Sequence, residues 1–290
     1  MAKSANNVPA PQTQGGQLPD YLRDMQKSAK VGNVDQTDFI IPRIKLLQKI
    51  SPECDAYEAA KPGRFWHTVM NADLGPELKF APILVRKTYV LWAPRNDDRG
   101  ILARASDGIH WDIPDLTFTV KPKGSQGDVV YTLGKTVHDR IDGRPAMSEF
   151  GSGIPGNPQS PPAASLTYEI LCYLADFPDM SPAIILNTRS QVKPGKDLLT
   201  KIESRPVDHY YGQYLAGVVT EKGDEGDYYN FRYSMDGYVP QAVGETTKGL
   251  FERFEKQSFR ANDERDDEGD KANRRGGGEP DPEAHKGKKF

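Results

Sequence analysis

Short runs of β-forming residues, separated by turn residues, dominate the chain from Gly63 to Tyr233. Such runs, bounded by Gly, Asp and Asn clusters, predict strands joined by hairpin loops and therefore a mainly β fold. In the second half of the chain, helices are also expected over Asp197–Glu203 and Glu245–Phe259. The expected strands are Phe65–Met70, Leu78–Val85, Thr88–Trp92, Ile101–Ala105, Thr117–Val120, Val129–Thr132, Ser165–Asp176, Ala183–Leu186, Tyr214–Lys222 and Tyr228–Tyr233.

The ends of the chain differ in composition from its middle. Hydrophobic residues make up 37% of the sequence, against about 45–50% in an average globular protein, and the deficit is concentrated at the ends. We therefore expect a disordered arm over 1–17, a β-rich core over 18–259 and a disordered charged tail over 260–290. Within the core, the Gly-, Pro- and Ser-rich residues 143–162 predict a flexible loop.

Charge and cysteine content exclude several classes of protein. The formal net charge of −3 and the pI of about 6.0 mean that contact with nucleic acid must come from a local basic patch. No run approaches about 18 apolar residues and no secretion signal is visible, so we expect a cytoplasmic protein without a membrane partner. Cys54 and Cys172 are too few for a disulfide framework or a four-cysteine zinc site, and we expect no metal and no cofactor.

Basic and aromatic side chains are interleaved between Arg64 and Arg95 on the expected strands. Cations hold a phosphate backbone while flat rings stack on unpaired bases, so this mixture is typical of a surface that binds single-stranded nucleic acid. The segment 187–196 adds further cations for phosphate contacts. In the competing interpretation the rings fill the core of a β-barrel. The candidate nucleic-acid-binding residues are Arg64, Trp66, Lys79, Phe80, Arg86, Lys87, Tyr89, Trp92, Arg95, Arg189, Lys193 and Lys196.

Two motifs suggest enzymatic chemistry without completing it. Residues 193–196 (Lys-Pro-Gly-Lys) contain the glycine–lysine pair of a phosphate-binding loop, but no glycine stands five residues before Gly195. Residues 77–79 (Glu-Leu-Lys) supply half of a Mg²⁺-dependent nuclease site, and no partner aspartate is suitably placed. We therefore predict a non-catalytic protein and keep a nuclease as the third interpretation.

The C-terminal tail carries two opposite charge clusters. Six acidic side chains lie within residues 263–270, and residues 286–290 are basic apart from Gly287 and Phe290. An acidic tail can occupy a protein's own basic groove until a ligand displaces it, or it can recruit partners. A basic terminus can instead add affinity for phosphates. A solubilising tail is the remaining alternative.

Residues 41–48 (Ile-Pro-Arg-Ile-Lys-Leu-Leu-Gln), followed by Ser-Pro-Glu at 51–53, resemble the opening of a group of uncharacterised tailed-phage proteins. Ser190 with the Lys-Pro-Gly-Lys turn fits the same group, and the resemblance spans 38–235. It implies a single-strand-binding protein of phage replication or recombination, built on an oligonucleotide-binding barrel. The chain departs from bacterial single-strand binders at its end, where Phe290 follows lysines, which argues against recruitment of host proteins through the terminus.

These features predict a mainly β protein, namely an oligonucleotide-binding-like barrel elaborated with extra strands, a C-terminal helix and disordered tails. The expected function is to coat and protect single-stranded DNA during phage replication or recombination in the host cell cytoplasm. The expected partners are single-stranded DNA, replication or recombination proteins that bind the tail, and further copies of the chain. The main alternative is a phage structural or interaction protein that docks through its tails.

Overall fold

The computed structural model describes residues 41–93, 100–120, 128–154, 156–223 and 226–255. Arg95, the expected arm over 1–17 and the expected tail over 260–290 lie outside these residues. The strands are β1 (Arg43–Leu46), β2 (Phe65–His67), β3 (Ala72–Gly75), β4 (Leu78–Trp92), β5 (Ile101–Ala105), β6 (Thr117–Val120), β7 (Val129–Thr132), β8 (Ala164–Leu174), β9 (Ala183–Thr188), β10 (Gly212–Gly223) and β11 (Gly226–Tyr238). The helices are α2 (Pro52–Ala56), α3 (Val192–Glu203) and α4 (Gln241–Glu255), with 3₁₀ turns η2 (Pro178–Met180), η3 (Arg189–Gln191) and η4 (His209–Tyr211). The prediction of a mainly β fold is confirmed.

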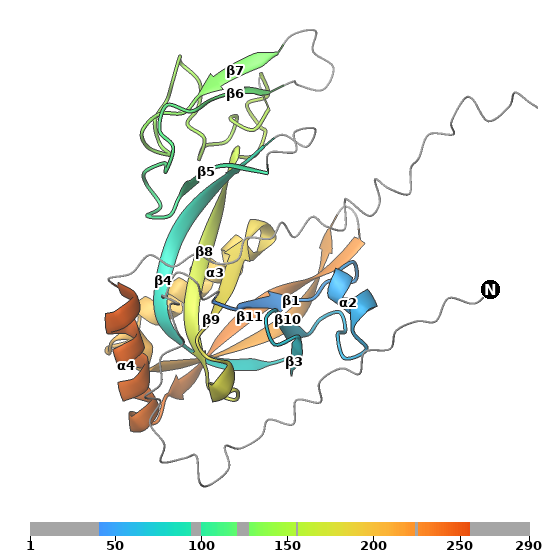
Figure 1. The fold of residues 1–290 in the computed structure, drawn as a ribbon, viewed down its shortest axis with the longest axis vertical. Coiled ribbons are helices and arrows are strands. Elements are labelled where there is room, and N and C mark those ends of the chain that lie inside the picture. Colours follow the sequence, from blue (N-terminus) through green and yellow to red (C-terminus); the bar gives the residue numbers. More distant parts are fainter. Residues whose placement is uncertain (1–40, 94–99, 121–127, 155, 224–225, 256–290) are drawn as a thin grey trace, which may run out of the picture.

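Nine of the strands in the described part of the chain form one curled sheet (Figure 1). Its order is β11-β10-β4-β8-β9-β1-β2-β3, with β5 paired to the far end of β4, and only the pair β1–β9 is parallel. The curl brings β11 back toward β1, where the side-chain amide of Gln48 exchanges hydrogen bonds of 2.9 and 2.8 Å with the backbone of Tyr229. The stacked rings of Phe65 and Phe231 pack at the same junction, 5.7 Å apart. The sheet is thus a half barrel.

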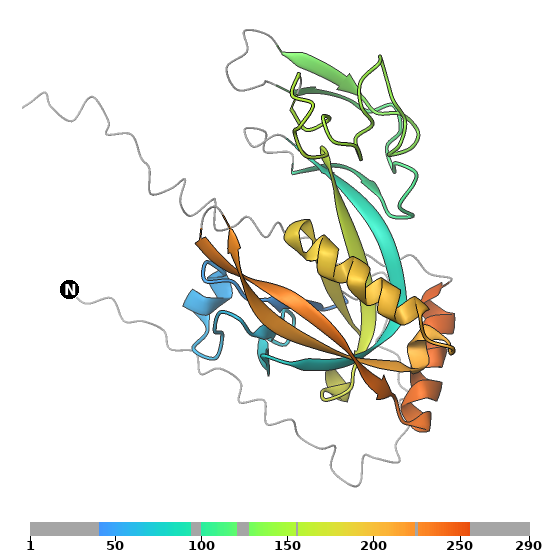
Figure 2. The same ribbon diagram turned by 180° about the vertical axis from the view of Figure 1, so that it is seen from behind.

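Helix α3 packs against the concave face of this half barrel (Figure 2). Its buried Leu198 and Ile202 belong to the same hydrophobic cluster as the inward-facing aromatic residues of β4, β10 and β11. Gly195 permits the close approach, because a β-carbon at this position would lie 2.9 Å from the Asn187 Cβ and 3.1 Å from the Tyr168 ring. Gly195 is therefore a packing glycine inside a helix.

Two of the three further hydrophobic clusters among the described residues cover the other face of the sheet and the lobe beyond its end. On the opposite face of the sheet, Phe254 of α4 packs with Ile83 and Leu171. Beyond the paired ends of β4 and β8, a lobe containing β5, β6 and β7 has its own cluster, which includes Trp111 and Phe118 (Figure 1). Among the described helices, none is both long and apolar enough to cross a membrane.

The structure joins two expected strands into one. The sequence predicts separate strands over 78–85 and 88–92, whereas β4 runs unbroken through both. The charged pair Arg86 and Lys87 fits inside the strand because successive side chains point to opposite faces. Lys87 is exposed, and the Nη2 of Arg86 donates a hydrogen bond to the Phe254 carbonyl at 3.2 Å.

Helix α3 is longer than predicted. It begins at Val192 rather than at Asp197, so Lys193 and Lys196 lie on its first turns and not in a loop. Pro194 does not interrupt it, because the first backbone N–H groups of a helix have no partner inside the helix to lose.

Residues 143–162 contain no helix or strand in their described part. Two buried serines fix this segment through their hydroxyl groups. The Oγ of Ser152 donates to the Glu149 carbonyl at 2.7 Å, and the Oγ of Ser160 accepts from the Ile154 N–H at 3.0 Å. The segment is thus tied to itself by side-chain hydrogen bonds.

Candidate nucleic-acid interface

One edge of β4 is only partly paired. Strand β8 pairs with the other edge along residues 80–91. On the partly paired edge, β10 takes residues 78–80 and β5 takes residues 89–92. No strand among the described residues pairs with this edge over 81–88. Strand β4 connects the half barrel with the lobe that contains β5, β6 and β7. It therefore has an open stretch in its middle.

Two neighbouring groups show which backbone atoms face this opening. The Ile83 carbonyl accepts a hydrogen bond from Nε2 of His209 at 2.8 Å. The Lys87 carbonyl points at Gly108, where a β-carbon would come within 2.6 Å of it. Because backbone direction repeats every second residue of a strand, the N–H and C=O of Val85 point to the same side. They therefore face the open stretch.

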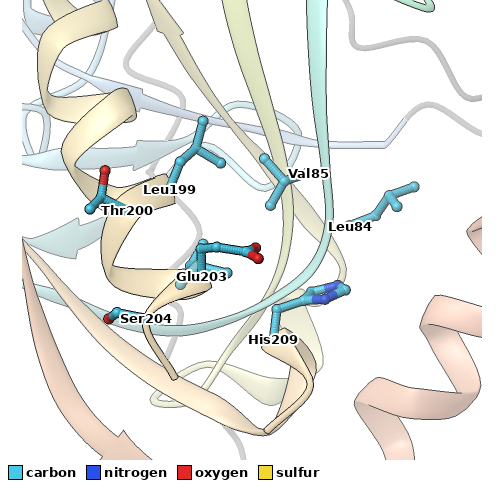
Figure 3. A pocket seen from close by; sticks show the side chains of 8 residues that line it. Leu84, Val85, Leu199, Thr200, Glu203, Ser204 and His209 are labelled. Carbon is cyan, nitrogen blue, oxygen red and sulfur yellow. The ribbon is translucent and has the colours of Figure 1, made fainter. Parts of the chain in front are cut away.

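A groove of about 740 Å³ adjoins the open edge (Figure 3). One wall is β4, with Leu84 and Val85, and the other is the last turns of α3, with Leu199 among its side chains. The remaining lining residues are Thr200, Ile202, Glu203, Ser204 and His209. The walls are thus mainly apolar, with a carboxylate and an imidazole at one end.

Cations continue both walls toward the N-terminal end of α3. Lys196 lies three and four residues before Leu199 and Thr200, so helical spacing places it on the same face of α3. Lys87 lies two residues after Val85, on the same face of β4. Both lysines are exposed. Beyond the lined groove, the strand and the helix that form its walls therefore each carry one exposed lysine, and this stretch is called the basic section.

Two more predicted cations lie at the start of α3. Arg189 is exposed and has a φ of 53°, an uncommon value outside glycine, at the turn that joins β9 to α3. Lys193 is exposed on the first turn, and its charge helps to lower the pKa of Glu221, after the hydrogen bonds from Tyr228 and Asn230. Arg189 therefore lies just before α3, and Lys193 lies on its first turn, one turn before Lys196.

Three of the four predicted stacking rings are core residues, and this corrects their predicted role. The exposed fractions of Trp66, Phe80 and Tyr89 are 0%, 0% and 6%. Trp66 packs on Tyr57 at 5.3 Å, and Phe80 lies 6.0 Å from Tyr214 in the cluster under α3. A base cannot reach either ring face without opening the core. Trp92, at the end of β4, is half-buried.

The predicted cations Arg64, Lys79 and Arg86 have protein partners. The Nε of Arg64 donates to both carboxylate oxygens of Asp73, at 2.9 and 2.8 Å, and this contact raises the pKa of the arginine. Lys79 lies 3.4 Å from Asp236. Burial lowers the pKa of Arg86, whose guanidinium bonds to the end of α4. These side chains hold strands and helices together.

Lys79 is also the lysine of the Glu-x-Lys motif considered for a nuclease. Lys79 forms an ion pair with Asp236 on β11. Glu77 is exposed just before β4. Within the described ranges, no three His, Cys, Asp or Glu side chains are grouped so as to hold a metal ion.

Sequence reasoning missed the lining residues of the groove. Val85, Leu199 and His209 resemble ordinary core or surface residues when the chain is taken linearly. They meet because β4 is longer than its two partners on one edge and because α3 crosses beside the uncovered part. A sequence prediction of one strand over 78–92 would have been the signal for these residues, because such a strand is longer than its partners and leaves part of one edge open.

A protein-family comparison places this chain. The model of the family described as Pam3 phage gp34-like protein matches residues 12–260. The chain belongs to this phage family. No curated protein and no solved structure matches it. The resemblance to phage proteins expected from residues 41–53 is thereby confirmed at the level of a phage family, whose description names no activity.

Proposed function

We propose that this phage protein binds single-stranded DNA along the groove between β4 and α3. The observation that carries the proposal is an apolar groove lined by Val85 and Leu199, with exposed Lys87 and Lys196 further along the strand and the helix that form its walls. In this proposal the half barrel acts as an oligonucleotide-binding-like scaffold, although the rings first expected to stack on bases form its core.

The physical argument rests on the different demands of bases and phosphates. Unpaired bases expose their flat faces, and moving these faces from water onto an apolar wall lowers the free energy. Nearby cations of the protein neutralise the phosphates and release the counterions bound to them, which favours binding. A duplex hides its base faces, so the apolar section of the groove gives it nothing. Because the chain has a net charge of −3, general attraction to duplex DNA is also weak.

Charge reversal at the two groove lysines tests this proposal. The double variant Lys87→Glu/Lys196→Glu should lose at least about tenfold in affinity for labelled oligo-dT at low salt, because two phosphate contacts become repulsive. The matched control, Lys49→Glu/Lys61→Glu, makes the same charge change at exposed positions near β1 and β2. Equal affinity losses in the two variants would show that only net charge matters and would refute the groove.

The biological role in this proposal is to coat and protect single strands during phage replication or recombination, without catalysis. The tail is the segment proposed to contact replication or recombination proteins. Oligo-dT protection from an added nuclease measures the coating role. The amount of DNA protected should increase in proportion to the protein added until the strand is covered. A protein that binds only DNA ends would not give this protection.

A second candidate function has an observation of its own. The open edge of β4 is a template that an extended peptide can pair with, as in other cases of β-strand addition. A phage interaction protein that docks on partners would use this edge. It predicts no preference for oligo-dT over a duplex of matched length, and stable association with another chain in size-exclusion chromatography.

A further inference from the structure

The end of helix α4 lies beside the open edge of β4. The ring of Phe251 lies 5.2 Å from that of His209, and His209 is bonded to the Ile83 carbonyl on this edge. One turn later, the Phe254 carbonyl accepts the hydrogen bond from Arg86. Buried Phe254 anchors the helix end to the sheet. The chain therefore leaves α4 close to the uncovered part of β4.

The chain that follows α4 has the length and charge to reach along this groove. Residues 256–290 follow Glu255, the last residue of α4. Residues 256–262 include one large apolar side chain, Phe259, and the acidic residues 263–270 come next. An extended chain covers about 3.3 Å per residue, so seven residues reach roughly 23 Å from the end of α4. The acidic residues can therefore reach the basic section of the groove.

We propose that residues 256–262 add as a short strand to the open edge of β4 and bring the acidic residues 263–270 against Lys87 and Lys196. The paired edge satisfies the N–H and C=O of Val85, which an open strand leaves to water or to another chain. The acidic residues complement the two lysines in charge. As a regulatory contact, this docking rests on the proposed function, because the tail and single-stranded DNA then compete for one groove.

Hydrogen exchange of the full-length protein without DNA tests the docking itself. The Val85 and Lys87 amides should be protected in the wild type. Their exchange should become at least about tenfold faster in Ser258→Pro/Phe259→Pro. Adjacent residues of a strand point their N–H groups to opposite edges, so one of the two prolines removes an N–H that would pair with β4. The control Ala284→Pro/His285→Pro, near the chain end, should leave exchange unchanged. Equal protection in the wild type and the Ser258→Pro/Phe259→Pro variant overturns the proposal.

Two further measurements identify the occupant and its effect. Loss of protection in Phe39→Pro/Ile40→Pro, with none in Ser258→Pro/Phe259→Pro, would assign the edge to the N-terminal segment and contradict the tail. Replacing the six acidic residues of 263–270 by their amides should tighten oligo-dT binding at least about fivefold at low salt and less at high salt. If the exchange result holds but no variant binds DNA, the docking stands and the proposed function fails. If DNA binds and exchange is unaffected, only the docking fails.

Discussion

The replacement Gly195→Ala tests whether α3 is seated against the sheet as closely as the structure indicates. The new methyl group would lie 2.9 Å from the Asn187 Cβ, and carbon atoms prefer about 3.5–4.0 Å. Asn187 belongs to buried β9, which cannot retreat, so α3 must move outward by about 0.6 Å or more. Overpacking of this kind costs about 1–3 kcal/mol. Exchanging a helical glycine for alanine returns about 0.8–1.0 kcal/mol, which leaves a net destabilisation of about 1 kcal/mol.

The matched control is Gly249→Ala in helix α4, where a β-carbon meets no atom within 4 Å. This variant should be more stable than the wild type by up to about 1 kcal/mol, since it gains helix propensity alone. Urea unfolding followed by circular dichroism measures both free energies of unfolding. If Gly195→Ala were as stable as Gly249→Ala, the close contact between α3 and β9 would be refuted, and with it the position of the groove wall.

Three further predictions concern the half barrel. Trp66→Ala should cost about 3–5 kcal/mol in urea unfolding, as for a buried aromatic residue, while the folded fraction keeps its affinity for oligo-dT; a stable variant with lost affinity would restore the stacking role. Burial lowers the pKa of His67, so the unfolded chain binds the proton first and the free energy of unfolding should fall as pH drops from about 6.5 through the lower folded pKa. His67→Gln should remove this part of the pH dependence, and an unchanged pH profile would contradict it. Gln48→Ala should cost about 1–3 kcal/mol and speed exchange of the Tyr229 amide; unchanged exchange would show that the amide bridge does not close the half barrel.

Most strands were predictable because their signal is local. The runs over Ile101–Ala105, Thr117–Val120 and Val129–Thr132 coincide with β5, β6 and β7. Turn residues bound each of them, and turn chemistry acts over a few neighbouring positions. Longer elements were less predictable at their ends. The runs over 78–85 and 88–92 were predicted as separate strands although they form the single strand β4, because the partners of a strand residue depend on the tertiary fold.

The candidate site was less predictable than the fold. A tryptophan or phenylalanine has the same identity on a core face and on a binding face, so the sequence left Trp66 and Phe80 open to both interpretations. Phe80 is buried in the cluster under α3, whereas Trp66 is buried in a separate small cluster with Leu47 and Ala60. The groove depends on the unequal lengths of β4, β5 and β10, which no local pattern encodes. The basic segment 187–196 was found, but the start of α3 at Val192 within it was not.

The most direct test of single-strand binding is a fluorescence-anisotropy titration of the wild-type protein with labelled oligo-dT and a matched duplex across a salt series. Binding should favour oligo-dT. If the DNA contacts only the four predicted cations on or beside the groove walls, namely Lys87, Arg189, Lys193 and Lys196, the logarithm of the affinity should fall against the logarithm of salt with a slope no steeper than about −3. Equal binding of the duplex, or no binding to either at low salt, would contradict the account.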